Sequence, residues 1–483
     1  MFPAVNGGQL CLLKPDEIVA IHETSMKILE EVGMKVKSAE AREIFAKNGA
    51  LVDSVSEIVK IPRRLVEQAI KTAPSKIVLY GQDEKNDLHL EGTRTHLGTG
   101  GTVLYALDME TGQKRPTTTK DVRDIGRMVD YCDNVSFYVV NTYPQDVPDA
   151  ASDINRFYWA LTNTTKHVMG GMYTAQGLKD VIAMAEEIAG GADELRARPI
   201  ISFIVLMISP LVMDGEYTDY LIKIAKKGLP VAVSSEPLAG ATSPVTIAGT
   251  IALNNAETLA GITLTQLINP GTPVLYGSTS SIMDMREGTY MAGPIESAMI
   301  NAGIAQMTQH YKLPMYGTGG MSDSKINDSQ AGYESALTVM TVALSGSNFI
   351  HDAVGILEMC QVFSYDKMII DNEILGNVLR LMKGIKVDED SLAFDAIRSV
   401  GCGGHFLAED HTVRHVRKEF FMPKVSDRQT RIKWQDGGSL TAEGRARKIV
   451  DKVLSKHIPT PVAKELKEKI RNKFPGIHGE ELY

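Results

Sequence analysis

The spacing of apolar residues changes along the first quarter of the chain. Near the start, residues such as Ile18, Ile21 and Leu29 recur at close to 3.6-residue intervals, which predicts helices between residues 14 and 75. The stretch from His89 to Asp108 is instead rich in Thr, Gly and Leu and ends in the turn sequence DMETG. This pattern predicts β structure with a hairpin.

From about residue 117, short apolar runs typical of buried strands alternate with helical patterns. The predicted strands are Ser136–Asn141, Lys166–Gly170, Ile200–Met207, Pro230–Ser235, Pro273–Gly277, Leu313–Gly317 and Ser347–His351. The predicted helices are Lys120–Tyr131, Ala151–Leu161, Gly177–Ile188, Tyr217–Lys227, Ala248–Leu267, Pro294–His310 and Gln330–Leu344. Seven consecutive β-then-α units predict a parallel sheet, and a series this long favours an α/β fold of the (β/α)8 TIM-barrel type. A doubly wound open sheet is the alternative.

The eighth strand of such a barrel has two candidates, Gln361–Ile370 and the earlier Gly101–Leu107. We expect three parts of the chain: an N-terminal helical and β extension (1–116), the TIM-barrel domain (117–435) and a C-terminal helical extension (436–483). The C-terminal extension is rich in lysine. It is expected to pack on the barrel or on a neighbouring subunit, and docking of an acidic partner is the alternative.

Composition narrows the class of protein. The chain has 51 Lys+Arg against 59 Asp+Glu, a formal charge of −8, which argues against a dedicated nucleic-acid binder. Its four cysteines lie far apart without a CxxC pair, and the N-terminus has no basic and apolar signal pattern, so we expect a cytoplasmic protein. The best candidate for a membrane span, residues 200–212, is shorter than the roughly 20 residues that a spanning helix needs.

Ionisable residues follow several of the predicted strands. In a TIM barrel the active site lies at the carboxyl ends of the strands. Glu236 follows one apolar strand, and the pair His351-Asp352 ends another. These three are the predicted catalytic residues. The polar, glycine-rich segment 317–330 follows a third strand and could form a lid over the same rim.

Other catalytic signatures are missing from the sequence. Neither GTGG segment continues into a dinucleotide-binding pattern, and there is no P-loop or G-x-S-x-G motif. Cys402 and His405, followed by His411 and His415, could in principle bind zinc. Glycines dominate this segment, so a close-packed turn with structural histidines is the preferred interpretation and no metal site is predicted.

Six motifs, in order along the chain, resemble one family. They are GTGGTVLYALDMETGQKRPTTTKDV (98–122), NTTKHVMGG (163–171), GGMSDSKINDSQAGYES (319–335), GSNFIHDAVGILE (346–358), IIDNEILG (369–376) and GGHFLAEDHTVRHVRKEFFMP (403–423). Together they resemble the corrinoid-dependent trimethylamine methyltransferase superfamily, over most of the chain.

This resemblance implies a TIM barrel that moves a methyl group from a methylated amine to the Co(I) of a separate corrinoid protein. The cobalamin would be carried by that partner and not bound covalently here, and the enzyme would be a homo-oligomer. The founding enzymes carry pyrrolysine, whereas this chain uses only the standard twenty residues. It is therefore similar to the non-pyrrolysine branch, which demethylates quaternary amines such as glycine betaine, proline betaine and carnitine.

A quaternary ammonium group cannot donate a hydrogen bond, so aromatic faces and carboxylates are expected to bind it. The candidate rings are Tyr105, Tyr143, Tyr276, Tyr316, Tyr333 and Phe349. Glu236 and Glu334 could supply negative charge. Gln330, at the start of the predicted helix 330–344, is a further candidate contact, and His351 or Asn348 could bind the carboxylate of a betaine, with Asp352 orienting the histidine. A zinc-dependent methyltransferase and a non-catalytic betaine-binding relative are the alternatives.

Overall fold

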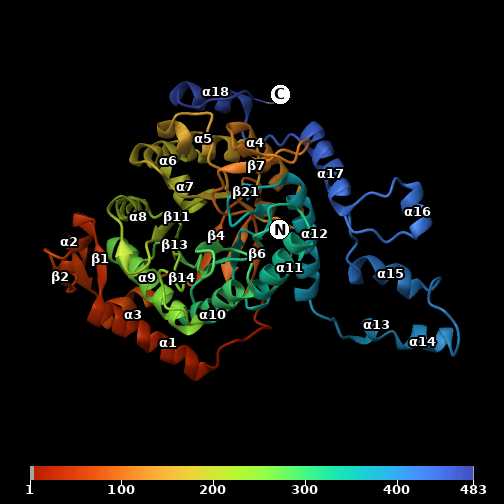
Figure 1. Cartoon of the computed structure of the whole chain (residues 1–483), viewed down its shortest axis with the longest axis horizontal. Coiled ribbons are helices and arrows are strands. Elements are labelled where there is room, and N and C mark those ends of the chain that lie inside the picture. Colours follow the sequence, from red (N-terminus) through yellow and green to blue (C-terminus); the bar gives the residue numbers. More distant parts are fainter. Residues whose placement is uncertain (1–4, 482–483) are drawn as a thin grey trace.

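A closed barrel of eight parallel strands forms the centre of the molecule (Figure 1). The computed structural model describes residues 5–481. Around the ring the strands are β6 (His96–Leu97), β19 (Phe349–His351), β18 (Met315–Thr318), β15 (Val274–Gly277), β13 (Val231–Ser235), β11 (Ile201–Met207), β10 (His167–Gly170) and β9 (Phe137–Val139). A parallel bridge between Gly98 and Phe137 joins the last strand to the first. The TIM-barrel prediction is confirmed and the open-sheet alternative is wrong.

All seven predicted helices are present around this ring. They are α4 (Thr119–Tyr131), α5 (Asp149–Leu161), α6 (Ala175–Ala189), α8 (Gly215–Lys227), α9 (Ile247–Ile268), α10 (Ile295–Tyr311) and α11 (Ser329–Leu344), with the short α7 (Ala192–Ala197) as an addition. α9 is buried along most of its length because α1, α3, α8 and α10 all pack against it. No helix within residues 5–481 is both long and apolar enough to cross a bilayer.

The eighth strand is neither of the two predicted candidates. It is β6, which ends just before the Gly101–Leu107 segment. That segment leads into β7 (Tyr105–Leu107), whereas Gln361–Ile370 contains β21 (Val362–Phe363) and the start of helix α12. A strand of two residues is too short to produce an alternating pattern, which is why the sequence did not reveal it. The ring therefore includes a strand that precedes residue 117, and the proposed domain boundaries remain a prediction.

The N-terminal segment mixes helices with a small sheet. Its helices are α1 (Pro15–Lys27), the π-helical turn η1 (Ile28–Val32), α2 (Ala39–Lys47) and α3 (Arg63–Thr72). Its strands, which helical periodicity did not predict, are β1 (Met34–Val36), β2 (Leu51–Asp53) and β3 (Ile58–Lys60). β1 also pairs with β12 (Val212–Met213), which lies in the loop after β11. This pairing attaches the extension to the barrel.

A hairpin closes the amino end of the barrel. It consists of β4 (Lys76–Leu79) and β5 (Leu88–Glu91), joined through the 3-10 turn η2 (Glu84–Asn86). Its buried side chains, Ile77 among them, pack against residues of the barrel interior. In that interior the rings of Phe137 and Phe349 stack with their centroids 3.5 Å apart. The barrel is therefore filled at its amino end, and access to its interior lies at the carboxyl end.

Two small sheets stand at the carboxyl end of the barrel. One contains β14 (Leu238–Ala239), β16 (Ser281–Asp284) and β17 (Thr289–Met291). The other contains β20 (Ile356–Leu357), β21, β7 and β8 (Lys114–Pro116). The β7–β8 pair is the hairpin predicted around Asp108. Both sheets follow or flank barrel strands and so build up the rim of the carboxyl end.

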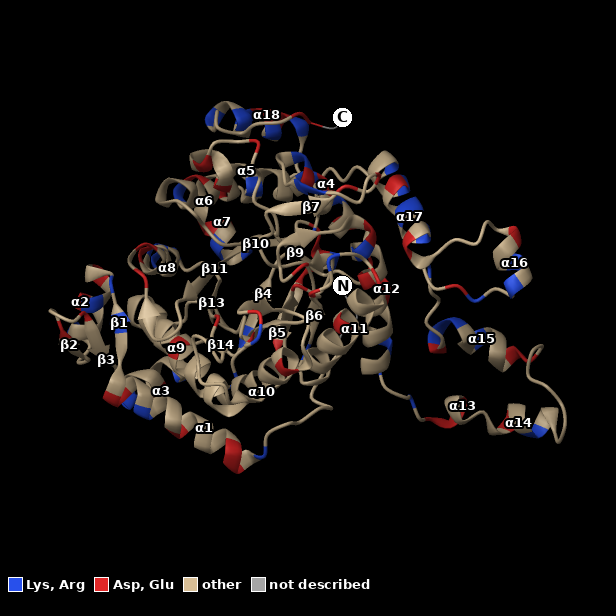
Figure 2. Cartoon of the chain, viewed as in Figure 1, with Lys and Arg blue, Asp and Glu red and all other residues tan. Residues whose placement is uncertain are grey.

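Residues 385–440 form an arm that extends away from the barrel after α12 (Tyr365–Met382) (Figure 1, right) and returns to α12 at residues 424–426, whose amides donate to Glu373. Its helices are α13 (Glu389–Leu392), α14 (Phe394–Val400), α15 (Asp410–Glu419) and α16 (Arg431–Asp436). The chain then returns through α17 (Ala442–Lys456) and α18 (Lys464–Lys473), where Lys and Arg are frequent (Figure 2). Lys469 and Lys473 of α18 bond to Glu187 of α6, and these contacts lower the pKa of Glu187 to about 2.

Candidate active site

The interior of the barrel opens to solvent at its carboxyl end. Side chains alternate along a strand, and Ile204 of β11 packs in the barrel interior, so Leu206 and Ile208 face inward as well. Leu206 is 36% exposed and Ile208 is 44% exposed. Inward-facing apolar side chains can be exposed only where the interior is hollow. We call this hollow, lined by the inward side chains that follow the strands, the barrel recess.

Glu236 is the acidic residue of the recess. Ala232 and Ser234 face inward on β13, and the same alternation turns Glu236 inward just beyond the end of the strand. Its side chain is exposed to solvent, yet protein surrounds it closely enough that desolvation, together with the charge of Asp352, raises the pKa of Glu236 to about 7. Glu236 makes no hydrogen bond or ion pair with any residue that the structure describes, so its charge is uncompensated.

His351 and Asp352 lie at the same end, as the last residue of β19 and the residue that follows it. His351 Nε2 is 2.7 Å from Thr318 Oγ1, and His351 Nδ1 is 2.8 Å from Asp352 Oδ2. The ring of Tyr316 stacks on the imidazole at a centroid distance of 4.1 Å. These contacts fix the orientation of the imidazole. Oδ1 of Asp352 is buried and has no hydrogen-bond partner within residues 5–481.

The backbone is tightly constrained around this pair. Asp352 has a φ of 63°, a left-handed conformation that non-glycine residues adopt rarely and that recurs at functional sites. Gly100 packs so closely that an added Cβ would lie 2.6 Å from His351 Nδ1. Only glycine fits at Gly100, which gives the GTGG motif a structural reason here.

Two residues of the site, Tyr290 and Cys360, were missed by sequence reasoning. Both interact electrostatically with Glu236 and Asp352, and burial beside these charges raises the pKa of each well above its usual value. Tyr290 lies on β17, in the long connection between β15 and α10. Connections in such units are usually about 2–6 residues, so the length of this one was a usable signal for an elaborated rim.

Asn141 adds an unsatisfied amide to the inner wall. Val139 of β9 packs in the barrel interior, so Asn141, two residues on, faces the same way. Asn141 is fully buried, and neither its Oδ1 nor its Nδ2 has a hydrogen-bond partner among the described residues. Ser234 Oγ on β13 is also buried without a hydrogen-bond partner among the described residues. Buried amides are normally paired, so Asn141 is a candidate for contact with a ligand.

Three of the predicted binding residues lie outside the recess. Asn348 is at the amino end of β19, where its amide donates to backbone carbonyls that include Arg94 O at 2.9 Å. Tyr276 faces outward and donates to Asn255 Oδ1 of α9 at 2.7 Å. Phe349 is buried in the filled part of the barrel. The hydrogen bonds and packing of these three side chains within the fold explain their presence without a ligand.

Gln330 and Glu334 hold the predicted lid segment in place. Glu334 accepts hydrogen bonds from Ser322 Oγ at 2.6 Å and from the Asp323 amide at 2.9 Å, and Gln330 donates to it at 3.0 Å. Asp323 in turn accepts from the amide of Ala292 at 2.7 Å. This network ties the segment after β18 to the end of the β16–β17 hairpin. Tyr333, the neighbouring ring, is 55% exposed on the outer face of α11.

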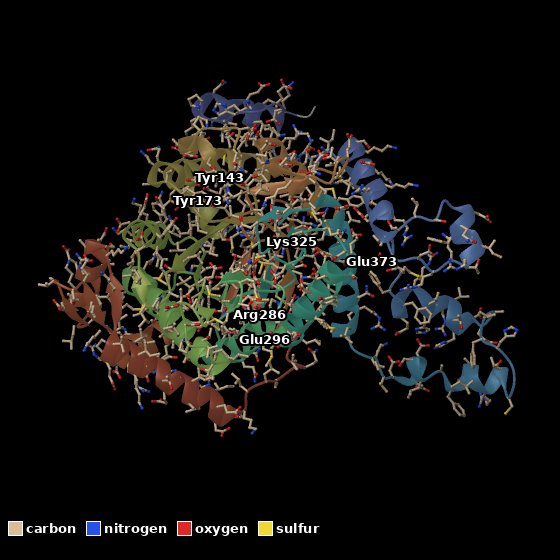
Figure 3. The ribbon with its side chains drawn as sticks, in the orientation of Figure 1. Tyr143, Tyr173, Arg286, Glu296, Lys325 and Glu373 are labelled. Carbon is tan, nitrogen blue, oxygen red and sulfur yellow. The ribbon has the colours of Figure 1, made fainter. Side chains whose placement is uncertain are left out.

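Tyr105 and Tyr143 lie on the rim. The ring of Tyr105 already carries a cation, since Lys114 Nζ lies 4.2 Å from its centroid. Tyr143 donates to Asp149 Oδ1 at 2.8 Å and meets Tyr173 edge-on at 5.1 Å. In Figure 3, Tyr143 and Tyr173 appear on one side of Lys325, and Arg286 and Glu296 on the other. All five come from the connections that follow barrel strands or from the helix start beyond them.

Cys402 and His405, the pair that the zinc-dependent alternative would use, do not come together with a third ligand within residues 5–481. Both residues are exposed on the arm, away from the barrel, and Cys402 is a free thiol. Within residues 5–481, neither belongs to a group of side chains close enough to hold a metal ion. A zinc-activated methyl acceptor at these residues would therefore be far from Glu236 and His351.

The sequence matches one family along nearly its whole length. Residues 3–474 match the family described as trimethylamine methyltransferase (MTTB). The chain is 39% identical to "Trimethylamine methyltransferase MttB" of Desulfitobacterium hafniense over 97% of this chain and 94% of that protein. It is 36% identical to "Glycine betaine methyltransferase" of another strain of that species, over 98% of each. It is also 36% identical to "Trimethylamine methyltransferase MttB" of Methanosarcina barkeri, over 95% and 94%. The chain therefore belongs to the trimethylamine methyltransferase (MTTB) family of methyltransferases.

Proposed function

We propose that this methyltransferase moves a methyl group from a quaternary amine of the betaine type to the Co(I) of a separate corrinoid protein and releases the tertiary amine. The observation that carries the proposal is the uncompensated charge of the barrel recess. Glu236 has no partner among the described residues, and Asp352 has one unpaired oxygen beside it. Such a site favours a cation.

The aromatic surroundings fit the same ligand. Tyr290 and Tyr316 both interact electrostatically with Glu236 and Asp352, so each phenol lies in the field of both carboxylates. A trimethylammonium head binds aromatic faces through cation–π attraction and carboxylates through charge, without needing a hydrogen-bond acceptor. The recess supplies both contacts through its two carboxylates and the partly buried ring of Tyr290, whereas Tyr316 is 1% exposed and stacks on the imidazole of His351.

The proposed reaction asks little acid–base chemistry of the protein. A quaternary ammonium already carries its charge, so transfer of a methyl group releases a neutral amine that needs no proton. The corrinoid supplies the nucleophilic cobalt. The chain's own residues then bind the cation, orient one methyl group toward the opening and exclude competing water, which is catalysis by proximity. This division of labour agrees with a sequence that contains no catalytic triad.

Asn141 is the proposed contact for the carboxylate end of a betaine. Nε2 of His351 already contacts Thr318 and Nδ1 lies against Asp352 Oδ2 at 2.8 Å, and Asn348 is at the far end of the barrel. The Nδ2 group of Asn141 is buried, faces inward and has no partner within the described chain. An amide that donates to a carboxylate would satisfy both groups.

Access to the recess supports a protein-borne acceptor. The hairpin of β4 and β5 fills the amino end, so the methyl acceptor must approach from the carboxyl end, between the two small sheets. A corrinoid domain would dock on that rim. We place the reaction in the cytoplasm, because all four cysteines are free thiols.

The arm supports the proposed homo-oligomer. Its large apolar side chains include Ile385 at 89%, Phe394 at 67% and Leu407 at 84% exposure. Apolar surface of this kind marks a site of contact with another protein. We expect a second copy of the chain to cover it. Light scattering should then show an oligomer that a Phe394→Asp/Leu407→Asp variant lowers toward the monomer mass. An unchanged mass in the variant would remove the arm from the interface.

The test of the activity is a substrate panel. The enzyme is incubated with a reduced corrinoid protein and one amine at a time, and the amine product is identified by mass. The amines are glycine betaine, proline betaine, carnitine, choline and trimethylamine. We expect demethylation of at least one carboxylate-bearing quaternary amine and little turnover of trimethylamine. Turnover of trimethylamine alone would contradict the proposed substrate class.

A further inference from the structure

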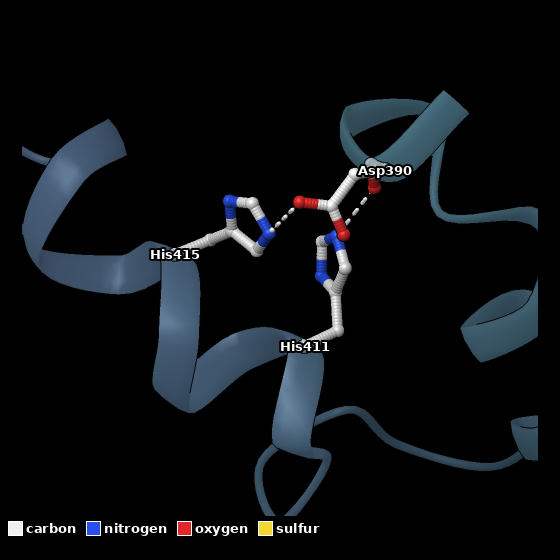
Figure 4. Close-up of side chains that lie close together, drawn as sticks. All are labelled: Asp390, His411 and His415. Carbon is white, nitrogen blue, oxygen red and sulfur yellow. Dashed lines mark hydrogen bonds and ion pairs between the residues drawn. The ribbon is translucent and has the colours of Figure 1, made fainter. Parts of the chain in front are cut away.

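Three side chains that could ligate a metal converge on the arm (Figure 4). Asp390 comes from α13, and His411 and His415 come from α15. One potential ligand atom from each lies within 4.8 Å of the others. This group is separate from the barrel recess and from the Cys402 and His405 pair considered from the sequence.

The local fold explains why these residues meet. His411 and His415 are four residues apart on a helix, so both project from one face. The chain reverses between α14 and α15 through Gly401 and Gly403, which both have positive φ values. α15 therefore returns alongside α13 and brings its two imidazoles to Asp390.

The present contacts leave room for an ion. His415 Nε2 is 3.0 Å from Asp390 Oδ2, yet it has no hydrogen-bond partner within residues 5–481. The two imidazole rings stack at a centroid distance of 4.2 Å, and His411 Nε2 is 3.0 Å from the backbone oxygen of Asp390. Arg414 also reaches Asp390, at 3.3 Å, but is well exposed and free to turn toward solvent.

The chemistry of the ligand set suits zinc. Zn²⁺ binds imidazole nitrogen and carboxylate oxygen at about 2.0–2.2 Å, and in a tetrahedron such ligand atoms lie about 3.4 Å from one another. The three ligand atoms lie within 4.8 Å of one another, so their separations need to shorten by at most about 1.4 Å, with solvent as the fourth ligand. We propose that Asp390, His411 and His415 bind a zinc ion that ties α13 to α15.

Such an ion would have a structural role. α13 and α15 lie on the arm, outside the barrel that holds the recess (Figure 1). Three short helices of the arm, α13, α14 and α16, bury no residue of their own, so their packing supplies little stability. A cross-link between residues 21 positions apart would fix the fold of the arm and the display of its apolar side chains.

The test measures bound zinc directly. The full chain, with any histidine tag removed, is stripped with EDTA, mixed with zinc chloride, desalted and analysed by plasma mass spectrometry. We expect about one zinc per chain in the wild type and in a His405→Ala control from the same arm. Loss of residues that only orient a ligand already costs about 10- to 100-fold in affinity, so a His411→Ala/His415→Ala variant should fall to background.

A second measurement separates ligand loss from misfolding. Hydrogen exchange of residues 389–419 should slow when zinc is added to the wild type and to His405→Ala, and should not respond in the double variant, whose barrel peptides should exchange as in the wild type. Equal zinc in the wild type and the double variant would overturn the proposal. So would loss of zinc in His405→Ala, or wild-type protein that retains no zinc.

Discussion

Thr318 Oγ1 lies 2.7 Å from His351 Nε2, and both side chains face the recess from neighbouring strands. Together with the contact of Nδ1 to Asp352, this bond fixes the plane of the imidazole. The imidazole, in turn, helps to hold Asp352 and the Tyr316 ring where a cation would bind.

Loss of this bond should slow turnover without unfolding the barrel. We expect Thr318→Val to lower kcat/KM for the quaternary amine about tenfold, which corresponds to the loss of one hydrogen bond of about 1.4 kcal/mol. Thr318→Ser keeps the hydroxyl and should retain most of the activity. Steady-state kinetics on both variants checks this. If kcat/KM falls equally in the two variants, the packing of the Thr318 side chain matters and its hydroxyl does not.

Neutralising Glu236 should weaken substrate binding. Because the substrate is a permanent cation, Glu236→Gln removes attraction in a partly desolvated site and should raise KM about tenfold or more. Glu296→Gln, at the exposed start of α10, is the matched control and should change KM less than twofold. If the two variants behave alike, general rim charge and not Glu236 attracts the substrate.

Because the pKa of Glu236 is about 7, substrate affinity should depend on pH near neutrality. A bound cation stabilises the carboxylate, so below pH 7 the group must lose a proton when the cation binds. We expect affinity to fall by up to about fivefold between pH 7 and 6, with proton release visible by calorimetry in buffers of different ionisation enthalpy. Glu236→Gln should bind more weakly at pH 8 and show neither effect. Wild-type affinity that is flat from pH 6 to 8 would exclude this role.

Asn141 should discriminate between substrates by their carboxylate. Asn141→Leu keeps the volume and removes an amide that has no partner among the described residues, so the fold should lose no stability. We expect KM for glycine betaine to rise about tenfold while that for a quaternary amine without a carboxylate, such as choline, stays within twofold. A parallel rise for both amines would mean that Asn141 shapes the recess without binding the carboxylate.

The buried pair of Lys367 and Asp371 should matter for stability. Lys367 Nζ lies 2.6 Å from Asp371 Oδ2, and Asp371 also accepts from the Gly355 amide at 2.7 Å, three residues beyond Asp352. Lys367→Met leaves a buried carboxylate unpaired and should cost about 3–5 kcal/mol in the free energy of unfolding. Adding Asp371→Leu should recover part of this. Denaturant unfolding of both variants measures it, and a cost near zero would mean that water reaches Asp371.

Periodicity predicted the barrel well because each of its repeating units contains a long, distinct pattern. The barrel strands β9, β10, β11, β13, β15, β18 and β19 and their helices all lie where apolar runs and helical spacing placed them. The strand β6 escaped because only His96 and Leu97 form it, and the strands β1 to β3 are only three residues each. Elements this short are defined by the partners they pair with and not by their own sequence.

Part of the proposed site follows from the sequence. The position of Glu236, His351 and Asp352 at strand ends followed from the fold class, and the structure brings them together. The sequence could not show whether a tyrosine faces the recess or a helix, which depends on register: Tyr316 faces inward, whereas Tyr276 faces α9. Tyr290 and Cys360 come from rim connections whose course no periodicity describes.

The most direct test of the proposed activity follows the methyl group itself. Glycine betaine with deuterated N-methyl groups is incubated with the enzyme and a reduced corrinoid protein, and both products are weighed by mass spectrometry. We expect dimethylglycine and a corrinoid that has gained one CD3 group, in equal amounts, and a greatly reduced yield with Glu236→Gln. The proposed activity would be contradicted if the betaine binds but no labelled corrinoid forms, and if no other quaternary amine of the panel methylates the corrinoid.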